Sequence, residues 1–328
     1  MAVEHSVDRR GARGRYAPSP TGRLHVGNAR TALLAWLAAR ARGATFVMRL
    51  EDLDAARVVP DGEAMLLDDL RWLGLDWDEG PDVGGSFFPY RQSQRRRDYD
   101  AAIERLLSEG RAYPCACSRA EVARSASAPH GGDDEGPRYP GTCRAQSAAA
   151  VEARARAAGR SPVIRFAGSG ERIAFVDGVH GAVEPMGEGG IDDFVLRRAD
   201  GVAAYQLAVV VDDAAMAIEE VVRGDDLLSS TPRQLALYQA LGAAAPRFAH
   251  VPLLLDPHGE RLAKRTRPAS LASLREAGGA PAAVVGRLAA SAGLTESARP
   301  LTADELLGSM MNAWSWARLA RRAAVWAP

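Results

Sequence analysis

The sequence predicts an α/β protein in which a parallel sheet is interrupted by an inserted α+β segment and followed by a short helical region. Three observations support this fold class. A strand, a glycine-bearing turn and a helix follow one another from Arg15 to Ala41, and a second short strand over 45–50 completes a βαβ unit. This alternation stops near residue 110, and short β-type runs resume near residue 194. A chain of 328 residues can hold two domains, or one large domain with an insertion.

The first part of the chain, residues 15–110, is predicted to be one half of a Rossmann-like domain. The preceding residues 1–14 are polar and basic, and we expect them to form a disordered arm. Apolar residues recur at helical spacing in two segments after the second strand. This periodicity predicts helices over 61–73 and 98–109.

An insertion is predicted over residues 111–193. Its segment 118–138 is rich in serine, alanine, glycine and aspartate, has little to bury, and is predicted to be a flexible excursion. An alanine- and arginine-rich helix is expected to follow over 146–159. Three short strands are then expected, at 163–166, 173–176 and 179–182.

The second half of the Rossmann-like domain is predicted over 194–245, with strands at 194–198 and 203–211. The second of these is expected to be buried on both faces, because Val209–Val211 is continuously apolar. Pro232 in a first turn predicts a helix over 231–241. The last part, 246–328, is predicted to hold a basic loop and short helices, at 282–290, 303–311 and 314–326.

Composition limits the partners and the compartment. The formal net charge is zero, so bulk charge gives no argument for a nucleic-acid partner. Arginines nevertheless cluster near 9–15, 91–97 and 318–322, either as phosphate contacts or as solvated faces. No apolar run reaches the length of a membrane span, and the N-terminus is polar. With three cysteines and no secretory signal, we expect a cytoplasmic protein without disulfides or membrane contact, and a monomer.

The most specific motif is the run Arg15-Tyr-Ala-Pro-Ser-Pro-Thr-Gly-Arg-Leu-His25-Val-Gly27-Asn28. Its glycines let the backbone approach a ligand, and the first N–H groups of the following helix point at it, an arrangement that receives phosphate in α/β folds. The run resembles the first signature of class I aminoacyl-tRNA synthetases, in the longer form of the glutamyl branch. The resemblance covers most of the chain, and it implies that His25, Gly27 and Asn28 bind ATP.

A basic loop near the end of that region resembles the second, lysine-bearing signature of the same family. It reads Arg261-Leu-Ala263-Lys264-Arg265, with Arg261 in place of the first lysine and Ala263 in place of a serine. Lys264 matches the second lysine, and a cation there can stabilise charge that develops on the β- and γ-phosphates. The resemblance implies that His25 and Lys264 are catalytic and that Mg²⁺ accompanies ATP. The substitutions in the loop leave the affinity for ATP open.

The amino-acid pocket is predicted from further resemblance to glutamyl synthetases. A guanidinium suits a substrate carboxylate, and an acid at the carboxyl end of the second strand could hold the α-ammonium. The form around Ser19 is glutamyl rather than glutaminyl, which implies L-glutamate as substrate. Without the resemblance, Tyr205 could be a core residue and Glu51 a helix cap, and which arginine meets the side chain stays open. The predicted glutamate-binding residues are Arg15, Ala17, Ser19, Glu51, Tyr205 and Arg223.

All three cysteines of the chain fall in the predicted insertion, as Cys115-Ala-Cys117 and Tyr139-Pro-Gly-Thr-Cys143. Zinc takes about four donors in a tetrahedron, which three thiolates and one phenolate would supply. The small members of the family that glutamylate queuosine have the same Cys-x-Cys…Tyr-x-x-x-Cys pattern. The resemblance therefore implies one structural Zn²⁺ on these four residues, and three ordinary buried thiols are the alternative.

The acceptor is predicted from the length of the chain beyond the lysine loop. Only about sixty residues come after Pro268, fewer than the anticodon-binding region of a glutamyl-tRNA synthetase needs. The chain thus resembles the truncated branch of the family. That resemblance implies glutamate activation without tRNA, then transfer to the queuosine base in the anticodon stem-loop of tRNA(Asp). The alternatives are charging of a tRNA 3′ end, a tRNA-independent glutamate-activating ligase, and a tRNA-binding module without activity, which would not need both halves of an ATP site.

Overall fold

A mixed sheet of six strands lies at the centre of the computed structural model, which describes residues 12–125, 138–184, 190–260, 262 and 270–326. Neighbouring strands are parallel, except for a hairpin of two strands at one edge. In spatial order the strands are β2 (Thr45–Met48), β1 (Arg13–Tyr16), β8 (Glu220–Gly224), β9 (Arg247–Val251), β5 (Phe175–Asp177) and β6 (Gly181–Val183).

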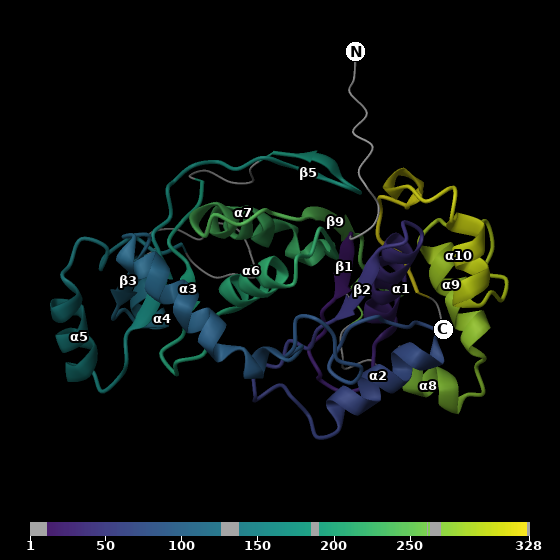
Figure 1. Cartoon of the computed structure of the whole chain (residues 1–328), viewed down its shortest axis with the longest axis horizontal. Helices are drawn as coiled ribbons and strands as arrows, with labels where there is room; N and C mark the ends of the chain where they lie inside the picture. The colour runs from purple at the N-terminus through teal and green to yellow at the C-terminus, as the bar shows by residue number, and fades with distance from the viewer. Residues whose placement is uncertain (1–11, 126–137, 185–189, 261, 263–269, 327–328) are drawn as a thin grey trace, which may run out of the picture.

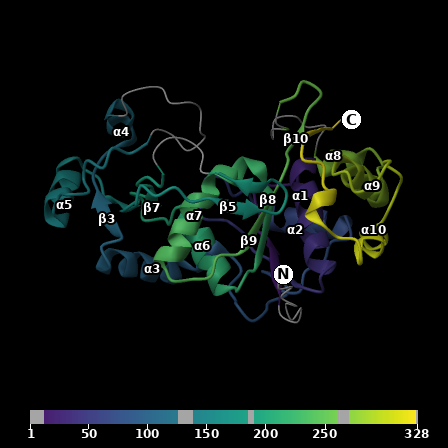
Figure 2. The same cartoon turned by 90° about the horizontal axis from the view of Figure 1, so that it is seen from above.

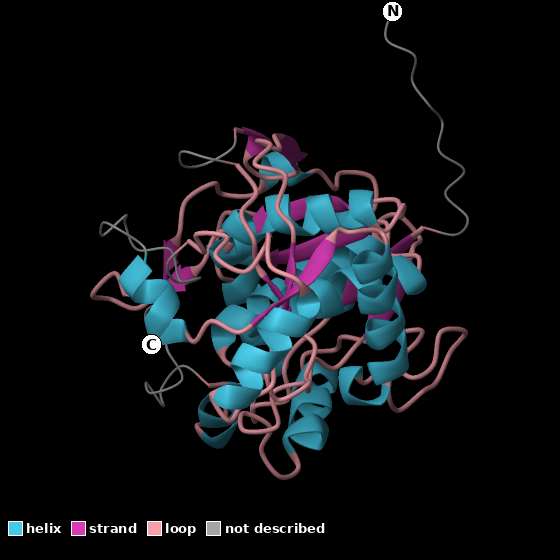
Figure 3. Ribbon diagram, turned by 90° about the vertical axis from the view of Figure 1, so that its left-hand side faces the viewer, coloured by secondary structure: helices cyan, strands magenta, loops and turns pink. Residues whose placement is uncertain are grey.

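Helices cover both faces of this sheet, and alternate strand residues enter two separate cores (Figure 3). Val222 and Ala249 belong to one core, whereas their neighbours Val221 and Phe248 belong to the other, as the two-residue period of a strand requires. The first core contains α1 (Val26–Arg40), α9 (Pro281–Ser291) and α10 (Ala303–Met310). The second contains α3 (Arg96–Ser108), α6 (Tyr205–Ala215) and α7 (Thr231–Ala240).

A second, antiparallel sheet forms one end of the elongated molecule (Figures 1 and 2). It consists of β3 (Ala112–Cys115), β4 (Val163–Phe166) and β7 (Val195–Arg197). Beside it lie α4 (Arg119–Ser125) and α5 (Ala148–Ala157), around a small core of their own. At the opposite end, the C-terminal helices pack against α1.

The remaining elements are short and join these parts. They are α2 (Gly62–Trp72), α8 (Leu271–Glu276), the parallel pair β10 (Leu254–Leu255) and β11 (Ala324–Val325), and the 3₁₀ turns η1 (Gln92–Gln94), η2 (Asp225–Ser230) and η4 (Trp316–Arg318). Among the described residues, no helix is both long and apolar enough to cross a membrane.

The strand predicted over 203–211 is wrong, because this segment forms helix α6. Four consecutive residues, 207–210, are buried, so the helix is covered nearly all round. A short continuous apolar run does not distinguish a buried strand from a buried helix. The helix continues to Ala215 and places Asp212 and Asp213 in the interior.

Strands expected inside the insertion are divided between the two sheets. β5 and β6, close to the predicted 173–176 and 179–182, extend the central sheet, because Asp177 of β5 pairs with Phe248 of β9. β7, predicted to start the second half of the central domain, instead pairs with β4 in the small sheet. Which sheet a strand joins depends on partner strands far away in the sequence. The local sequence pattern gives no information about those partners.

Two terminal predictions also need correction. Arg13 and Gly14 are not part of a disordered arm but form β1, where they pair with Thr45 and Phe46. The helix predicted over 314–326 is absent; η4 and strand β11 occur there. The excursion predicted over 118–138 begins with helix α4, and its residues 126–137 lie outside the described ones, as do residues 1–11.

Candidate active site

The turn between β1 and α1 carries the first signature, and His25 caps the helix. Its Nδ1 accepts a hydrogen bond from the backbone N–H of Gly27, with 3.3 Å between the two nitrogens. Burial lowers the pKa of His25, so the ring is neutral and its proton is on Nε2. That Nε2 is buried and has no hydrogen-bond partner among the described residues. A buried N–H donor at a helix N-terminus suits a phosphate or ribose oxygen.

Helix α2 fixes this turn by hydrogen bonds. The fully buried carboxylate of Asp69 accepts the backbone N–H of Leu24 at 2.8 Å and a guanidinium N–H of Arg23 at 2.8 Å. Leu271 of α8 donates its N–H to the carbonyl oxygen of Leu24 at 2.9 Å, and Ser270 pairs with His25. The chain that leaves the lysine loop is therefore fixed beside the first signature. Arg261, Ala263, Lys264 and Arg265 themselves lie outside the described residues.

Two buried arginines belong to neighbouring strands of the central sheet, Arg15 to β1 and Arg223 to β8. The Nε and Nη2 of Arg15 each lie 3.3 Å from a carboxylate oxygen of Asp213 on α6. Asp213 also accepts Nη1 of Arg49 at 2.6 Å, and Nη2 of Arg49 lies 3.4 Å from Glu51. One carboxylate thus fixes two buried guanidiniums at the end of the second strand.

Arg223 is held by hydrogen bonds on all of its nitrogens. Nε donates to His250 at 3.0 Å, Nη1 to Gln234 at 2.8 Å, and Nη2 to Thr231 at 2.9 Å. The longest contact is from Nη1 to the hydroxyl of Tyr205, at 3.5 Å. The hydrogen bond to Tyr205 is therefore the weakest of these contacts. A ligand carboxylate could replace it at the smallest cost in hydrogen bonding.

Electrostatic interactions connect several of these residues. Burial lowers the pKa of Arg223, and the charge of Arg15 lowers it further. Burial raises the pKa of Tyr205, with Arg223 opposing this and Glu51 adding to it. Burial also raises the pKa of Glu51, against the charges of Arg49 and Arg15. Four of the six residues predicted to bind glutamate are thus within electrostatic reach of one another.

The other predicted residues line the same turn or begin the helix. Ala17 is half-buried and Ser19 exposed between β1 and α1, and the carbonyl oxygen of Pro18 between them accepts the N–H of Glu51 at 3.0 Å. Asn28 is exposed on the first turn of α1, where its carbonyl oxygen accepts the hydroxyl of Tyr16 at 3.1 Å.

The three cysteines form a compact cluster next to the small sheet. All three sulfurs lie within 4.8 Å of one another, and Sγ of Cys117 is 3.6 Å from Sγ of Cys143. The hydroxyl oxygen of Tyr139 lies 3.3 Å from Sγ of Cys115 and 3.6 Å from Sγ of Cys117. Sulfurs bound to one tetrahedral zinc lie about 3.8 Å apart, given Zn–S bonds of about 2.3 Å. The donor set therefore fits a zinc ion.

Comparison with known proteins identifies the family. The family model for the catalytic domain of class I tRNA synthetases (E and Q) matches residues 12–320. The chain belongs to this family. It is therefore a ligase of the class I synthetase type, with the α/β fold of that class.

Individual relatives and structures of the family differ in how much of them the chain covers. A glutamyl-Q tRNA(Asp) synthetase of Symbiobacterium thermophilum is 56% identical over 296 residues, 90% of each chain. Glutamate–tRNA ligase 1 of Halorhodospira halophila is 49% identical over 84% of this chain. The matched region makes up 57% of that ligase. The solved glutamate tRNA ligase of Elizabethkingia meningosepticum, in complex with its amino acid, has a TM-score of 0.80 at 29% identity, over 97% of this chain and 67% of that one.

Sequence reasoning missed the buried acids behind the site of this synthetase. Asp212 accepts hydrogen bonds from Arg95, Gln92 and Tyr99, and Asp213 holds Arg15 and Arg49. Two adjacent acids that directly follow a buried apolar run were the available signal, since carboxylates are almost never buried unpaired. The contribution of His250 had no comparable signal in the sequence.

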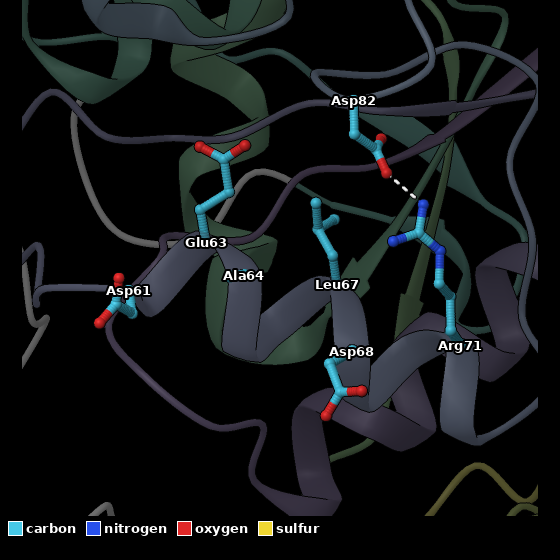
Figure 4. A pocket seen from close by; sticks show the side chains of 7 residues that line it. All are labelled: Asp61, Glu63, Ala64, Leu67, Asp68, Arg71 and Asp82. Carbon is cyan, nitrogen blue, oxygen red and sulfur yellow. Dashed lines mark hydrogen bonds and ion pairs between the residues drawn. The ribbon is translucent and has the colours of Figure 1, made fainter.

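A hollow of about 490 Å³ on α2 does not coincide with the site (Figure 4). Four of the seven residues that line it are acidic, and Arg71 pairs with Asp82. It includes none of the residues predicted to bind ATP or glutamate. Three of its acids belong to surface ion pairs, Glu63 with Arg91, Asp68 with Arg23 and Asp82 with Arg71.

Proposed function

We propose that this synthetase activates L-glutamate with ATP and transfers it to the queuosine base in the anticodon loop of tRNA(Asp). The observation that carries the proposal is the 56% identity, over 90% of both chains, to a protein named glutamyl-Q tRNA(Asp) synthetase. Two further proteins of that name are 50% identical over 92% and 90% of this chain. The glutamate–tRNA ligases match at 44–49% and extend well beyond the matched region.

In the activation step, the α-carboxylate of glutamate attacks the α-phosphate of ATP. A mixed anhydride forms and pyrophosphate leaves, so no protein nucleophile is needed and catalysis depends on positioning and charge. The buried Nε2–H of His25 and the N–H groups at the start of α1 would hold the nucleotide. Lys264 would neutralise the leaving pyrophosphate, and Mg²⁺ would be bound with the phosphates.

Glutamate recognition is proposed to use the paired charges of the pocket. Arg15 and Arg223 would receive the two carboxylates, and Glu51 the α-ammonium group. The geometry that supports this is the pair of buried guanidiniums, of which Arg223 keeps one edge toward Tyr205. Glutamine should be rejected, because its neutral amide would leave a buried guanidinium without a counter-charge.

We also infer one structural zinc ion, bound by Cys115, Cys117, Tyr139 and Cys143. The sulfur separations and the phenol oxygen support this. Hydrogen bonds also favour a charged Cys143: although burial opposes ionisation, contacts with Tyr139 and Cys117 and a backbone N–H lower its pKa to about 7. The small sheet and helices around the cluster would form the surface that meets the anticodon stem.

Exchange of labelled pyrophosphate into ATP tests the activation half directly. We expect exchange that depends on glutamate, needs no tRNA, and is much weaker with glutamine. Lys264→Ala should lower it strongly, whereas a change at an exposed position outside the site, such as Asp200→Asn, should not. Equal exchange with glutamine, or undiminished exchange by Lys264→Ala, would contradict these assignments.

A further inference from the structure

A line of buried polar side chains crosses the central sheet from β5 to α6. Asp177 of β5 lies 2.6 Å from Nδ1 of His250 on β9, and Nε2 of His250 lies 3.0 Å from Nε of Arg223 on β8. Arg223 in turn contacts Tyr205 at the start of α6. The exposed fractions of Asp177, His250 and Arg223 are 2%, 0% and 5%, so water does not interrupt the line.

The hydrogen bonds fix where the protons are. Asp177 accepts the backbone N–H groups of Val179, His180 and His250, which together with the His250 ring hold its pKa below the ordinary value although burial opposes this. Burial lowers the pKa of His250 to about 4, so its ring is neutral near pH 7. A neutral ring beside a carboxylate carries its proton on Nδ1, which leaves Nε2 as an acceptor for Arg223 at 3.0 Å and for the hydroxyl of Thr231 at 3.1 Å.

This arrangement leaves Arg223 little freedom. With Nε on His250, Nη1 on Gln234 and Nη2 on Thr231, the plane of the guanidinium is fixed before any substrate arrives. Such fixing matters because a carboxylate is recognised by the direction of the N–H groups as well as by charge. A guanidinium that could rotate would discriminate less between a carboxylate and an amide oxygen.

We propose that Asp177 and His250 are positioning residues that orient Arg223 for a carboxylate of glutamate, and thereby set the preference for glutamate over glutamine. The inference rests on the proposed function. Asp177 acts through the ring tautomer: it keeps the proton on Nδ1, so that Nε2 faces Arg223 as an acceptor. An amide at position 177 can donate to Nδ1 and move the ring proton to Nε2, where it would oppose an N–H of Arg223.

The test compares four variants in glutamate-dependent pyrophosphate exchange, with circular dichroism and melting to verify the fold. His250→Phe removes the acceptor and should raise the KM for glutamate roughly tenfold to hundredfold, with the KM for ATP unchanged. Asp177→Asn should raise the KM for glutamate by a similar factor. Both variants should show a smaller ratio of activity with glutamate to activity with glutamine. His250→Gln, whose side-chain oxygen can replace Nε2, should recover most of the loss. His180→Phe, which keeps the backbone N–H that Asp177 accepts and changes only the imidazole, is the control.

Two readouts separate positioning from a structural role. Because Asp177 acts through His250, Asp177→Asn should add nothing in the His250→Phe background. Nitrogen-15 NMR of labelled histidine should show His250 protonated at Nδ1 in the wild type and at Nε2 in Asp177→Asn. Additive losses, equal rises in the KM for ATP and glutamate, or an unchanged tautomer would overturn the inference while the proposed function stands. A wild type without glutamate-dependent exchange would instead overturn the proposed function, and the inference with it.

Discussion

At the scale of single residues, buried charge holds the site together. Asp213 pairs with both Arg15 and Arg49, and the exposed fractions of these three side chains are 3%, 4% and 0%. Ion pairs this deep are costly to form, but removing one partner costs more because the other charge stays buried and unpaired. Asp213 therefore links the stability of the fold to the position of Arg15.

Replacing this one acid should destabilise the fold. Asp213→Asn leaves Arg15 and Arg49 without their shared counter-charge and should lower the free energy of unfolding by about 3–5 kcal/mol. Urea unfolding measures this. The matched control is Asp200→Asn, an exposed acid beside Arg198, which should change the free energy by less than about 0.5 kcal/mol. Equal effects of the two changes would contradict the role of Asp213.

The ionisation of Glu51 should appear in the pH dependence of glutamate binding. Burial raises the pKa of Glu51, and only its ionised form can hold an ammonium group. As the pH falls through this raised pKa, protonation competes with substrate, so the KM for glutamate should rise in wild type. Glu51→Gln should show a high KM without that pH-dependent step. Titration of the free substrate is common to both proteins and cancels in the comparison; identical profiles would exclude Glu51 from ammonium binding.

At the scale of elements, the sequence predicted most helices and missed those whose environment decides their form. The helices over 61–73, 98–109, 231–241 and 282–290 are confirmed with small shifts at their ends. Apolar residues at helical spacing predicted the first two, and Pro232 in a first turn predicted the third. Helix α6 contains the continuous apolar run Val209–Val211, which a buried strand would also show. The segment 314–326 is rich in tryptophan and alanine yet forms a turn and a strand that pairs with β10. In both, tertiary packing overrides the local pattern.

Helix α5 closes the cysteine cluster and gives a prediction of its own. Nη2 of Arg154 lies 2.8 Å from Sγ of Cys143 and 3.3 Å from Sγ of Cys117, and its charge favours a thiolate on Cys143. Metal analysis of protein purified without added zinc should find one zinc per chain. Cys143→Ser should lose the metal and lower the melting temperature, and Tyr139→Phe should weaken binding.

The exposed neighbour Thr142 offers the control for this element. Thr142→Ser should keep both the metal and the melting temperature. A metal-free wild type that melts at the same temperature with and without chelator would make the three cysteines ordinary buried thiols.

At the scale of the whole molecule, the sequence predicted the class of fold but not how its strands are shared. The chain leaves the central sheet after β2, builds the small sheet with β3 and β4, returns to the central sheet for β5 and β6, and goes back once more for β7. Nothing local in 173–183 distinguishes these two destinations. The consequence for function is direct, because the return of β5 brings Asp177 beside His250.

For the candidate site, the sequence predicted which residues lie near one another but not the residues that support them. Motif resemblance led to Arg15, Glu51, Tyr205 and Arg223, and the structure places them within electrostatic reach of one another. The buried support behind them could not be predicted, since those hydrogen bonds join residues as far apart in the chain as Arg15 and Asp213.

The central claim is the transfer of glutamate to queuosine, and one measurement tests it most directly. Labelled glutamate and ATP are offered to tRNA(Asp) with and without queuosine, and the label is located after ribonuclease digestion, with Lys264→Ala as the inactive control. The account predicts label in the anticodon-loop fragment of queuosine-containing tRNA(Asp) only. Label on the 3′-terminal adenosine, or equal labelling of tRNA(Asp) that lacks queuosine, would contradict it.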